Sequence, residues 1–163
     1  MTQDNLNGLT VQQLISLHRA TLQELMRRGV VRTLNAPQGD FAERLVAEAF
    51  DGELSPNSEK SWDVRTGSGV LLQVKSRVVH DGDPASARAT SPFRSWGFDA
   101  AVIVFLANDD LSVVQATELP VEAVRGASRW VDHVNGWVLT PSQAVMASGR
   151  DVTELLRAAA ASL

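Results

Sequence analysis

Three side chains in the middle of the chain, Asp63, Gln73 and Lys75, carry groups that act together in phosphate chemistry. They supply a carboxylate, an amide oxygen and an ammonium. Hard cations such as Mg²⁺ take oxygen ligands, and an ammonium stabilises negative charge that develops on a phosphate. We therefore expect a divalent cation held by Asp63, by the Gln73 side-chain oxygen and by the backbone carbonyl of Val74. Lys75 is expected to serve as the nearby positive charge.

Two runs of alternating residues, 62–65 and 71–77, are expected to position these groups. Alternation of apolar and polar residues predicts strands with one buried and one open face. Residues 66–69 (TGSG) suit a tight turn, so the two strands should form a hairpin. The side chains expected to point into the core are Trp62, Val64, Leu72 and Val74. Those expected to share the open face are Asp63, Arg65, Gln73, Lys75 and Arg77.

A helix over residues 40–50 is expected before the hairpin, because its apolar residues recur at helical spacing. Glu43 lies at the edge of the predicted buried face, where its carboxylate can lean toward a neighbouring sheet. After the hairpin, the polar residues 80–95 form an unusually long connection, with a short helix expected near residues 84–90.

The second half of the chain begins with an apolar run at residues 98–106, which predicts a strand buried on both faces. Residues 111–116 should return beside it as an antiparallel strand. Later residues are expected to be mostly helical, apart from a strand near 133–139. This order predicts the α/β class: a single domain with a central mixed β-sheet flanked by helices.

An amphipathic helix over residues 11–28 precedes this domain and could serve as a dimerisation arm. We therefore expect two parts, residues 1–33 for the helix and 34–163 for the α/β domain.

Composition limits the cellular setting. The chain has 163 residues, 44% of them hydrophobic, which is enough for one compact core. Cysteine is absent, no apolar run is long enough to cross a membrane, and the first residues lack the pattern of a signal peptide. We expect a cytoplasmic protein that does not enter the membrane.

The distribution of charge favours a phosphate-bearing partner more than the net charge does. The net charge is −4, but residues 60–94 hold six basic and three acidic residues, so this segment is +3 and the remainder −7. A locally basic face can attract phosphate, because screening confines the field to about 10 Å. Ordinary scatter of surface charge explains the same numbers equally well.

The spacing of Asp63 and Gln73-Val74-Lys75 after the helix segment GDFAE at 39–43 resembles the PD-(D/E)XK nuclease superfamily. The resemblance covers about residues 38–115 and implies a restriction endonuclease-like core. It implies that Asp63 is the acidic metal ligand, that Gln73 occupies the second acidic position and that Lys75 is the catalytic lysine. Glu43 would match the first-helix glutamate that many resolvase-like members add to the metal site.

The resemblance also implies a function: Mg²⁺- or Mn²⁺-dependent cleavage of DNA, of restriction, repair or resolvase type. A homodimer is expected if both strands are cut. The candidate DNA contacts are Arg65, Arg77, His80, Arg88 and Arg94, since phosphate recognition favours basic side chains. Each of these is also compatible with an ordinary surface position.

Two residues depart from the superfamily pattern: Trp62 stands where proline is common, and Gln73 replaces an acid. Some active members carry glutamine at the second position. A neutral ligand should hold a cation less tightly, and Glu43 is then expected to compensate in part.

Two other functions stay open. Gln73 and the acidic net charge favour a catalytically inactive nuclease-fold module that binds nucleic acid or protein. A structural subunit that docks through the first helix is the third reading.

A late cluster of aromatic and basic residues has two readings as well. It could stack on a base, or its tryptophans could pack beneath the last helices. Its members are Arg129, Trp130, His133 and Trp137.

Overall fold

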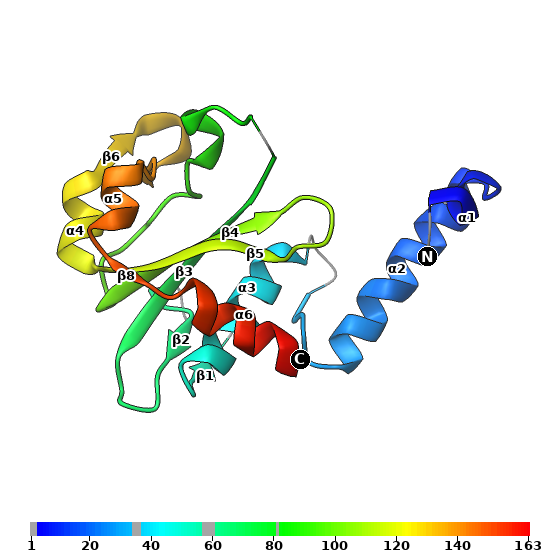
Figure 1. The fold of residues 1–163 in the computed structure, drawn as a ribbon, viewed down its shortest axis with the longest axis horizontal. Coiled ribbons are helices and arrows are strands. Elements are labelled where there is room, and N and C mark those ends of the chain that lie inside the picture. The colour runs from blue at the N-terminus through cyan, green and yellow to red at the C-terminus, as the bar shows by residue number, and fades with distance from the viewer. Residues whose placement is uncertain (1–2, 34–36, 57–60, 81) are drawn as a thin grey trace. The chain divides into compact units, whose positions relative to one another are not determined.

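The computed structural model describes residues 3–33, 37–56, 61–80 and 82–163, which divide into two compact units, Met1–Phe41 and Ala42–Leu163 (Figure 1). The helices, including two 3₁₀ turns (η), are α1 (Gln3–Asn7), α2 (Val11–Arg27), α3 (Gln38–Ala49), η1 (Ala85–Arg88), α4 (Val121–Ala127), η2 (Asp132–Val134), α5 (Gln143–Ala147) and α6 (Thr153–Ser162). The strands are β1 (Glu53–Leu54), β2 (Val64–Arg65), β3 (Leu71–Val79), β4 (Ala100–Ala107), β5 (Val113–Pro120), β6 (Ser128–Val131), β7 (Gly136–Leu139) and β8 (Arg150–Asp151).

The first unit is dominated by α2, the amphipathic helix expected from the sequence. Thr10 and Gln13 close its start reciprocally: the Gln13 N–H donates to Thr10 Oγ1, and the Thr10 N–H donates to Gln13 Oε1 at 2.8 Å. Part of its apolar stripe faces solvent, with Val11 74% and Ile15 64% exposed. None of the helices among the described residues is long and apolar enough to cross a membrane.

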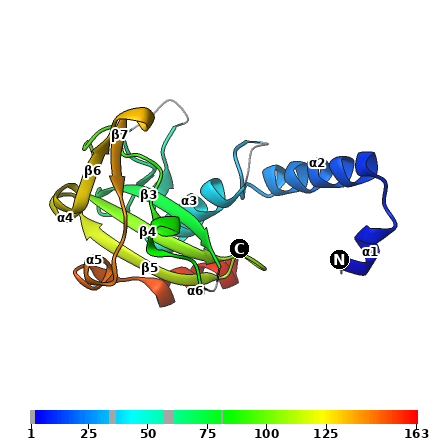
Figure 2. The same ribbon diagram turned by 90° about the horizontal axis from the view of Figure 1, so that it is seen from above.

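The second unit is built on a six-stranded sheet with the order β1-β2-β3-β4-β5-β8, whose central strands β3, β4 and β5 are labelled in Figure 2. β3 and β4 run parallel, and the other neighbouring pairs run antiparallel. The mixed sheet and its flanking helices confirm the predicted α/β class. Parallel neighbours require a crossover, which explains why the long polar connection lies between β3 and β4.

β4 is the centre of the core, as its continuous apolar sequence predicts. Every residue from Ala100 to Leu106 is buried. Ala101, Ile103 and Phe105 share a cluster with residues of α4, β7 and α5. The alternate residues of β4 face the other side of the sheet, where Figure 1 places α3 and α6. The buried residues of those two helices include Ala42, Leu45, Val46, Leu156 and Ala159.

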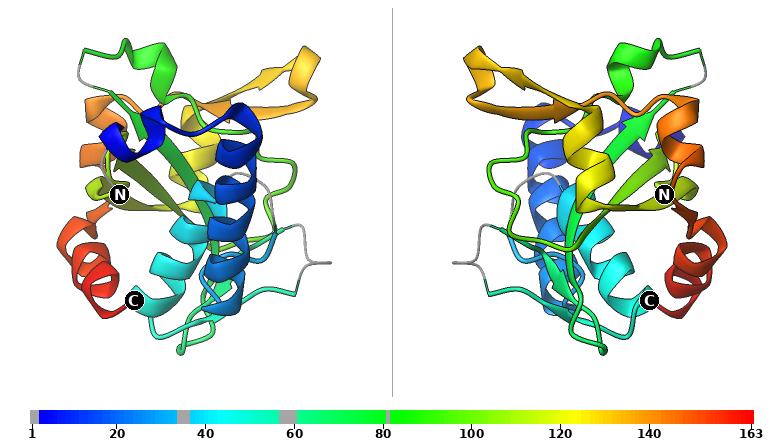
Figure 3. Two further views of the ribbon diagram at one scale, coloured as in Figure 1. Left: turned by 90° about the vertical axis from the view of Figure 1, so that its right-hand side faces the viewer. Right: turned by 90° about the vertical axis from the view of Figure 1, so that its left-hand side faces the viewer.

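A separate two-stranded sheet is formed by β6 and β7, which in Figure 3 projects away from the main sheet. Its strands pair antiparallel, with Trp130 opposite Trp137. β7 confirms the later part of the strand expected near residues 133–139, and η2 takes the place of its start. The expectation that the other late residues are helical was wrong for β6 and β8, because both are short strands, of which β6 pairs with β7 and β8 with the distant β5.

The hairpin of β2 and β3 forms as predicted, but it is irregular at Asp63. Val64 pairs with Leu72, and yet the N–H of Asp63 also donates to the Leu72 carbonyl at 2.8 Å. Two consecutive residues therefore oppose one residue of β3, which is the arrangement of a β-bulge. A bulge interrupts the alternation of side chains between the two faces of a strand.

This irregularity corrects the expected position of Trp62. Val64, Leu72 and Val74 are buried as predicted. Trp62 instead packs against the cluster that Leu71 and Val79 of β3 also join. Strict alternation would have placed Trp62 on the same face as Val64, and the extra residue at Asp63 reverses it.

The face of β3 that was expected to be open is covered around its centre. Gln73 is only 9% exposed and Lys75 is half-buried, because residues 92–98 lie across this face with Phe93 and Phe98 in the core cluster. Only Arg77 on β3 and Arg65 on β2 remain exposed, as expected.

Gly52 keeps β1 close to β2, and therefore close to Asp63. A Cβ atom at this position would lie 2.7 Å from the Arg65 carbonyl oxygen and 2.9 Å from Val64 Cγ1. The absence of a side chain at Gly52 thus permits the close approach of the two strands.

Candidate active site

Asp63 is held by its backbone between two strands. Its N–H donates to Leu72 of β3, and its carbonyl accepts from the N–H of Ser55, just after β1, at 2.8 Å. β2 therefore fixes the half-buried Asp63 side chain against the edge of β3, at the point where the regular pairing of β2 and β3 stops.

One oxygen of the Asp63 carboxylate receives two donors from β3. The backbone N–H of Val74 donates to Oδ2 at 2.7 Å, and the Gln73 side chain donates to the same oxygen through Nε2. In an extended strand, the N–H and C=O of one residue point to the same side. The Val74 carbonyl therefore faces the same edge as Asp63, where it could serve as a ligand.

Lys75 lies deeper on the same strand, against the segment that crosses over β3. Its Nζ is 3.4 Å from the Pro92 carbonyl oxygen and 5.0 Å from the centre of the Phe93 ring. Burial lowers the pKa of the Lys75 ammonium below its ordinary value of 10.5, and the Asp63 and Glu43 carboxylates oppose that shift, while Arg94 adds to it. Lys75 therefore interacts electrostatically with both expected acidic ligands.

Glu43 reaches this site from α3. It is half-buried beside the fully buried Ala42, at the edge of the helix face that packs on the sheet. Its effect on the pKa of Lys75 brings it into the same group as Asp63. Asp63 and Gln73 are thus hydrogen-bonded at one edge of β3, Lys75 lies on the same strand, and Glu43 on α3 is near enough for its charge to act on Lys75.

The oxygen atoms of these residues can coordinate a hard cation such as Mg²⁺ if the Gln73 amide rotates. Asp63, Glu43 and the Val74 carbonyl offer oxygen atoms, the ligands that Mg²⁺ prefers. Gln73 turns its NH₂ group toward Asp63, so its amide must rotate to present oxygen to a shared cation. Among the described residues, no three His, Cys, Asp or Glu side chains gather closely enough to hold a metal by themselves.

The expected DNA contacts are exposed but do not form one patch. Arg65 stacks on Trp62 near the start of β3, whereas His80 follows its end, roughly 27 Å along the strand. His80 and Arg88 line a hollow of about 340 Å³. Arg77 donates to the Ala89 carbonyl at 2.7 Å, which ties it to the crossover segment.

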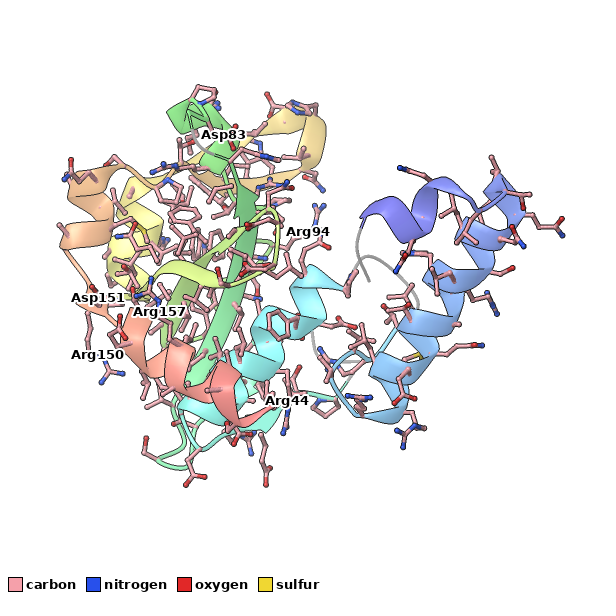
Figure 4. All side chains as sticks on the ribbon, turned by 45° about the vertical axis from the view of Figure 1, so that its right-hand side comes forward. Arg44, Asp83, Arg94, Arg150, Asp151 and Arg157 are labelled. Carbon is pink, nitrogen blue, oxygen red and sulfur yellow. The ribbon has the colours of Figure 1, made fainter. Side chains whose placement is uncertain are left out.

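Arg94, which Figure 4 labels, is the expected DNA contact whose charge helps to lower the pKa of Lys75. Its Nη1 donates to the Asn135 carbonyl at 2.6 Å, at the turn between β6 and β7. Because Arg94 acts on Lys75 and also binds Asn135, it connects the Lys75 site with the projecting hairpin. Its side chain is exposed.

Sequence reasoning missed Pro92 and Phe93, which contact Lys75. They come 17 and 18 residues after it, in a segment without periodicity. Phe93 is one of the few large apolar residues in a polar stretch, and that was the available signal for its burial.

No protein-family model and no curated protein matches the sequence.

Replacing Gln73 with Glu should destabilise the metal-free protein at neutral pH. A second carboxylate would then face Asp63, and the repulsion between them raises the pKa of the new glutamate. The loss of folding stability therefore grows as pH rises above about 4. We expect the free energy of unfolding to fall by about 2 kcal/mol at pH 7 in EDTA, and Mg²⁺ to restore it. Urea unfolding with and without Mg²⁺ measures both effects. Gln143→Glu, at an exposed position on α5, is the control and should not respond to Mg²⁺.

Replacing Lys75 with Met should stabilise the protein at neutral pH. Because the pKa of Lys75 is below 10.5 in the folded state, the unfolded chain binds the proton more tightly, and wild-type stability should rise relative to the variant as pH approaches 10.5. The advantage of Lys75→Met should therefore be largest near pH 7 and shrink by pH 10. Thermal unfolding across this range checks the trend, and an advantage that grows with pH would contradict it.

Proposed function

We propose that this chain is a metal-dependent DNA endonuclease of the PD-(D/E)XK type, which hydrolyses phosphodiester bonds. The observation that carries the proposal is the hydrogen-bonded group of Asp63, Gln73 and the Val74 backbone at one edge of β3, with Lys75 on the same strand and the Asp63 and Glu43 carboxylates acting on its pKa. These residues are dispersed over 33 positions of the sequence. An ordinary surface ion pair between Asp63 and Lys75 is the alternative explanation, but it would require neither a half-buried Lys75 nor a carboxylate from α3.

Each residue has a distinct task in this proposal. Asp63 and Glu43 hold the cation, with the Val74 carbonyl and a rotated Gln73 amide as neutral ligands. When bound, Mg²⁺ polarises the phosphate and lowers the pKa of water. The Lys75 ammonium donates to the attacking water or to the phosphate oxygen on which charge develops. Burial keeps this ammonium poorly hydrated, so its interaction with a phosphate is stronger than in bulk water.

A second candidate function is supported by the hydrogen bond from Gln73 to Asp63. A neutral amide that is satisfied by the carboxylate stabilises the site without a cation. In that case the fold would bind nucleic acid or protein and would not cut. Retained DNA binding without metal uptake would favour this second function.

Incubation of the purified protein with supercoiled, linear and branched DNA and Mg²⁺ or Mn²⁺ tests cleavage. We expect nicking or cutting that requires the metal, and losses of about 100-fold or more for Asp63→Asn and Lys75→Ala, since each removes charge that acts on the transition state. Glu122→Gln, an exposed acid on α4, is the matched control and should cut normally. Failure to cut any substrate, or full activity in Lys75→Ala, would rule out the endonuclease.

We also propose that the protein is a homodimer, with α2 as the contact between the two copies. One set of site residues per chain would serve one strand, so cutting a duplex calls for a second copy. The solvent-exposed apolar residues Val11 and Ile15 on α2 offer a surface for it. Sedimentation should give a dimer for the full chain and a monomer for Ile15→Lys. Glu48→Lys, on the exposed side of α3, should stay dimeric; a monomeric wild type would contradict the proposal.

A further inference from the structure

A continuous run of aromatic rings leads from the surface of the β6–β7 hairpin to Lys75. Trp130 meets Trp137 edge-on, with ring centres 5.6 Å apart, and Trp137 contacts Trp96 at 6.0 Å. Trp96 stacks on Phe93 at 5.7 Å, and Phe93 lies beneath the Lys75 ammonium. The rings therefore connect an exposed site on the hairpin with the candidate active site.

The hairpin is also tied to the active-site segment through its backbone. The N–H of Phe93 donates to the Trp137 carbonyl at 2.8 Å, and the N–H of Trp137 donates back at 3.0 Å. Arg94 adds its bond to the Asn135 carbonyl. These contacts fix the hairpin relative to Pro92 and Phe93, which hold Lys75. A ligand bound to the hairpin would therefore lie at a fixed position relative to the candidate active site.

Trp130 is placed to present its ring to a ligand. It is 47% exposed, and its indole N–H is already satisfied by Asp132 Oδ1 at 2.8 Å. The surface left for contact is therefore the apolar ring. Successive residues of a strand point to opposite faces, so the exposed Arg129 offers a positive charge on the other face of the same hairpin.

The surroundings of Trp130 favour a nucleic acid over a protein partner. The exposed side chains beside it in the hairpin, Arg129, Asp132 and His133, are polar or charged. Among the described residues, the other large hydrophobic side chains with high exposure lie on α2, β5 and α6 or at the C-terminus, away from the hairpin in sequence. Trp130 is thus the one highly exposed large apolar side chain among the described residues of the hairpin, whereas the centre of a protein interface is a wider apolar surface.

We infer that the β6–β7 hairpin binds DNA at the point where a duplex gives way to unpaired bases, with Trp130 stacking on the first exposed base. This inference rests on the proposed function, which supplies the DNA. Inside a duplex the faces of the bases are occupied by their neighbours, and an indole finds a free face only at an end, a fork or a single strand. Arg129, on the opposite face of the hairpin, contacts the phosphates of the strand that diverges. The preferred substrate is therefore branched or partly single-stranded DNA.

Binding in EDTA separates this inference from catalysis. Fluorescence anisotropy with a duplex, a single strand and a fork of the same sequence should give the tightest binding for the fork. Trp130→Ala should weaken fork binding roughly 5- to 100-fold and duplex binding less than about twofold, because a stacked base is lost. Trp130→Phe should retain most of the preference, since it keeps a ring. Leu155→Ala, another exposed hydrophobic position, is the matched control and should bind as wild type.

The outcomes distinguish the two proposals. If the wild type binds and cuts DNA but shows no preference for the fork, or if Trp130→Ala binds the fork as tightly as wild type, the hairpin inference is overturned and the endonuclease stands. A protein-docking role for Trp130 would give this second result. If the wild type neither binds nor cuts DNA, the proposed function fails and the inference fails with it.

Discussion

The carboxylate of Asp63, just before the start of β2, completes the edge of β3, and the candidate site depends on this interaction. The Val74 N–H would otherwise face an edge without a strand acceptor, and Asp63 Oδ2 satisfies it at 2.7 Å. The bulge at Asp63 and Val64 turns the side chain toward that position. The same oxygen then accepts from Gln73. A single local irregularity therefore fixes the central acidic residue, its neutral neighbour and the backbone carbonyl of Val74 on one edge.

Lys75 illustrates how the crossover shapes the chemistry. Because β3 and β4 are parallel, the chain must return along the sheet between them, and residues 92–98 cover part of β3 on the way. This cover removes water from the Lys75 ammonium and lowers its pKa, although two carboxylates lie nearby. A desolvated ammonium next to acids is less stable than one in water, but it is well prepared to interact with an incoming phosphate. Burial of Lys75 thus lowers the stability of the folded protein and strengthens the interaction of its ammonium with a phosphate.

Gln73 separates the two proposed functions physically. Its amide has a donor end and an acceptor end, and the donor end faces Asp63. An ionised acid at this position could not do so, because it has no hydrogen to donate and its charge would repel that of Asp63. Glutamine can therefore form a hydrogen bond with Asp63 and, after rotation of its amide, offer an oxygen to a cation. The projecting hairpin matters for both functions, since either an enzyme or a binding module could use Trp130 to hold DNA.

The sequence by itself determined the α/β class, the hairpin of β2 and β3, the buried strand β4 and the proximity of Asp63 and Gln73. These follow from short-range alternation and apolar runs, which depend on neighbours in the chain. Only the tertiary structure decided the face on which Trp62 lies, the burial of Gln73 and Lys75, and the contacts of Lys75 with Pro92 and Phe93. A bulge arises from pairing with another strand, and a crossover covers residues that are distant in sequence. The alternation of residues within one strand therefore predicts neither the bulge nor the covered residues.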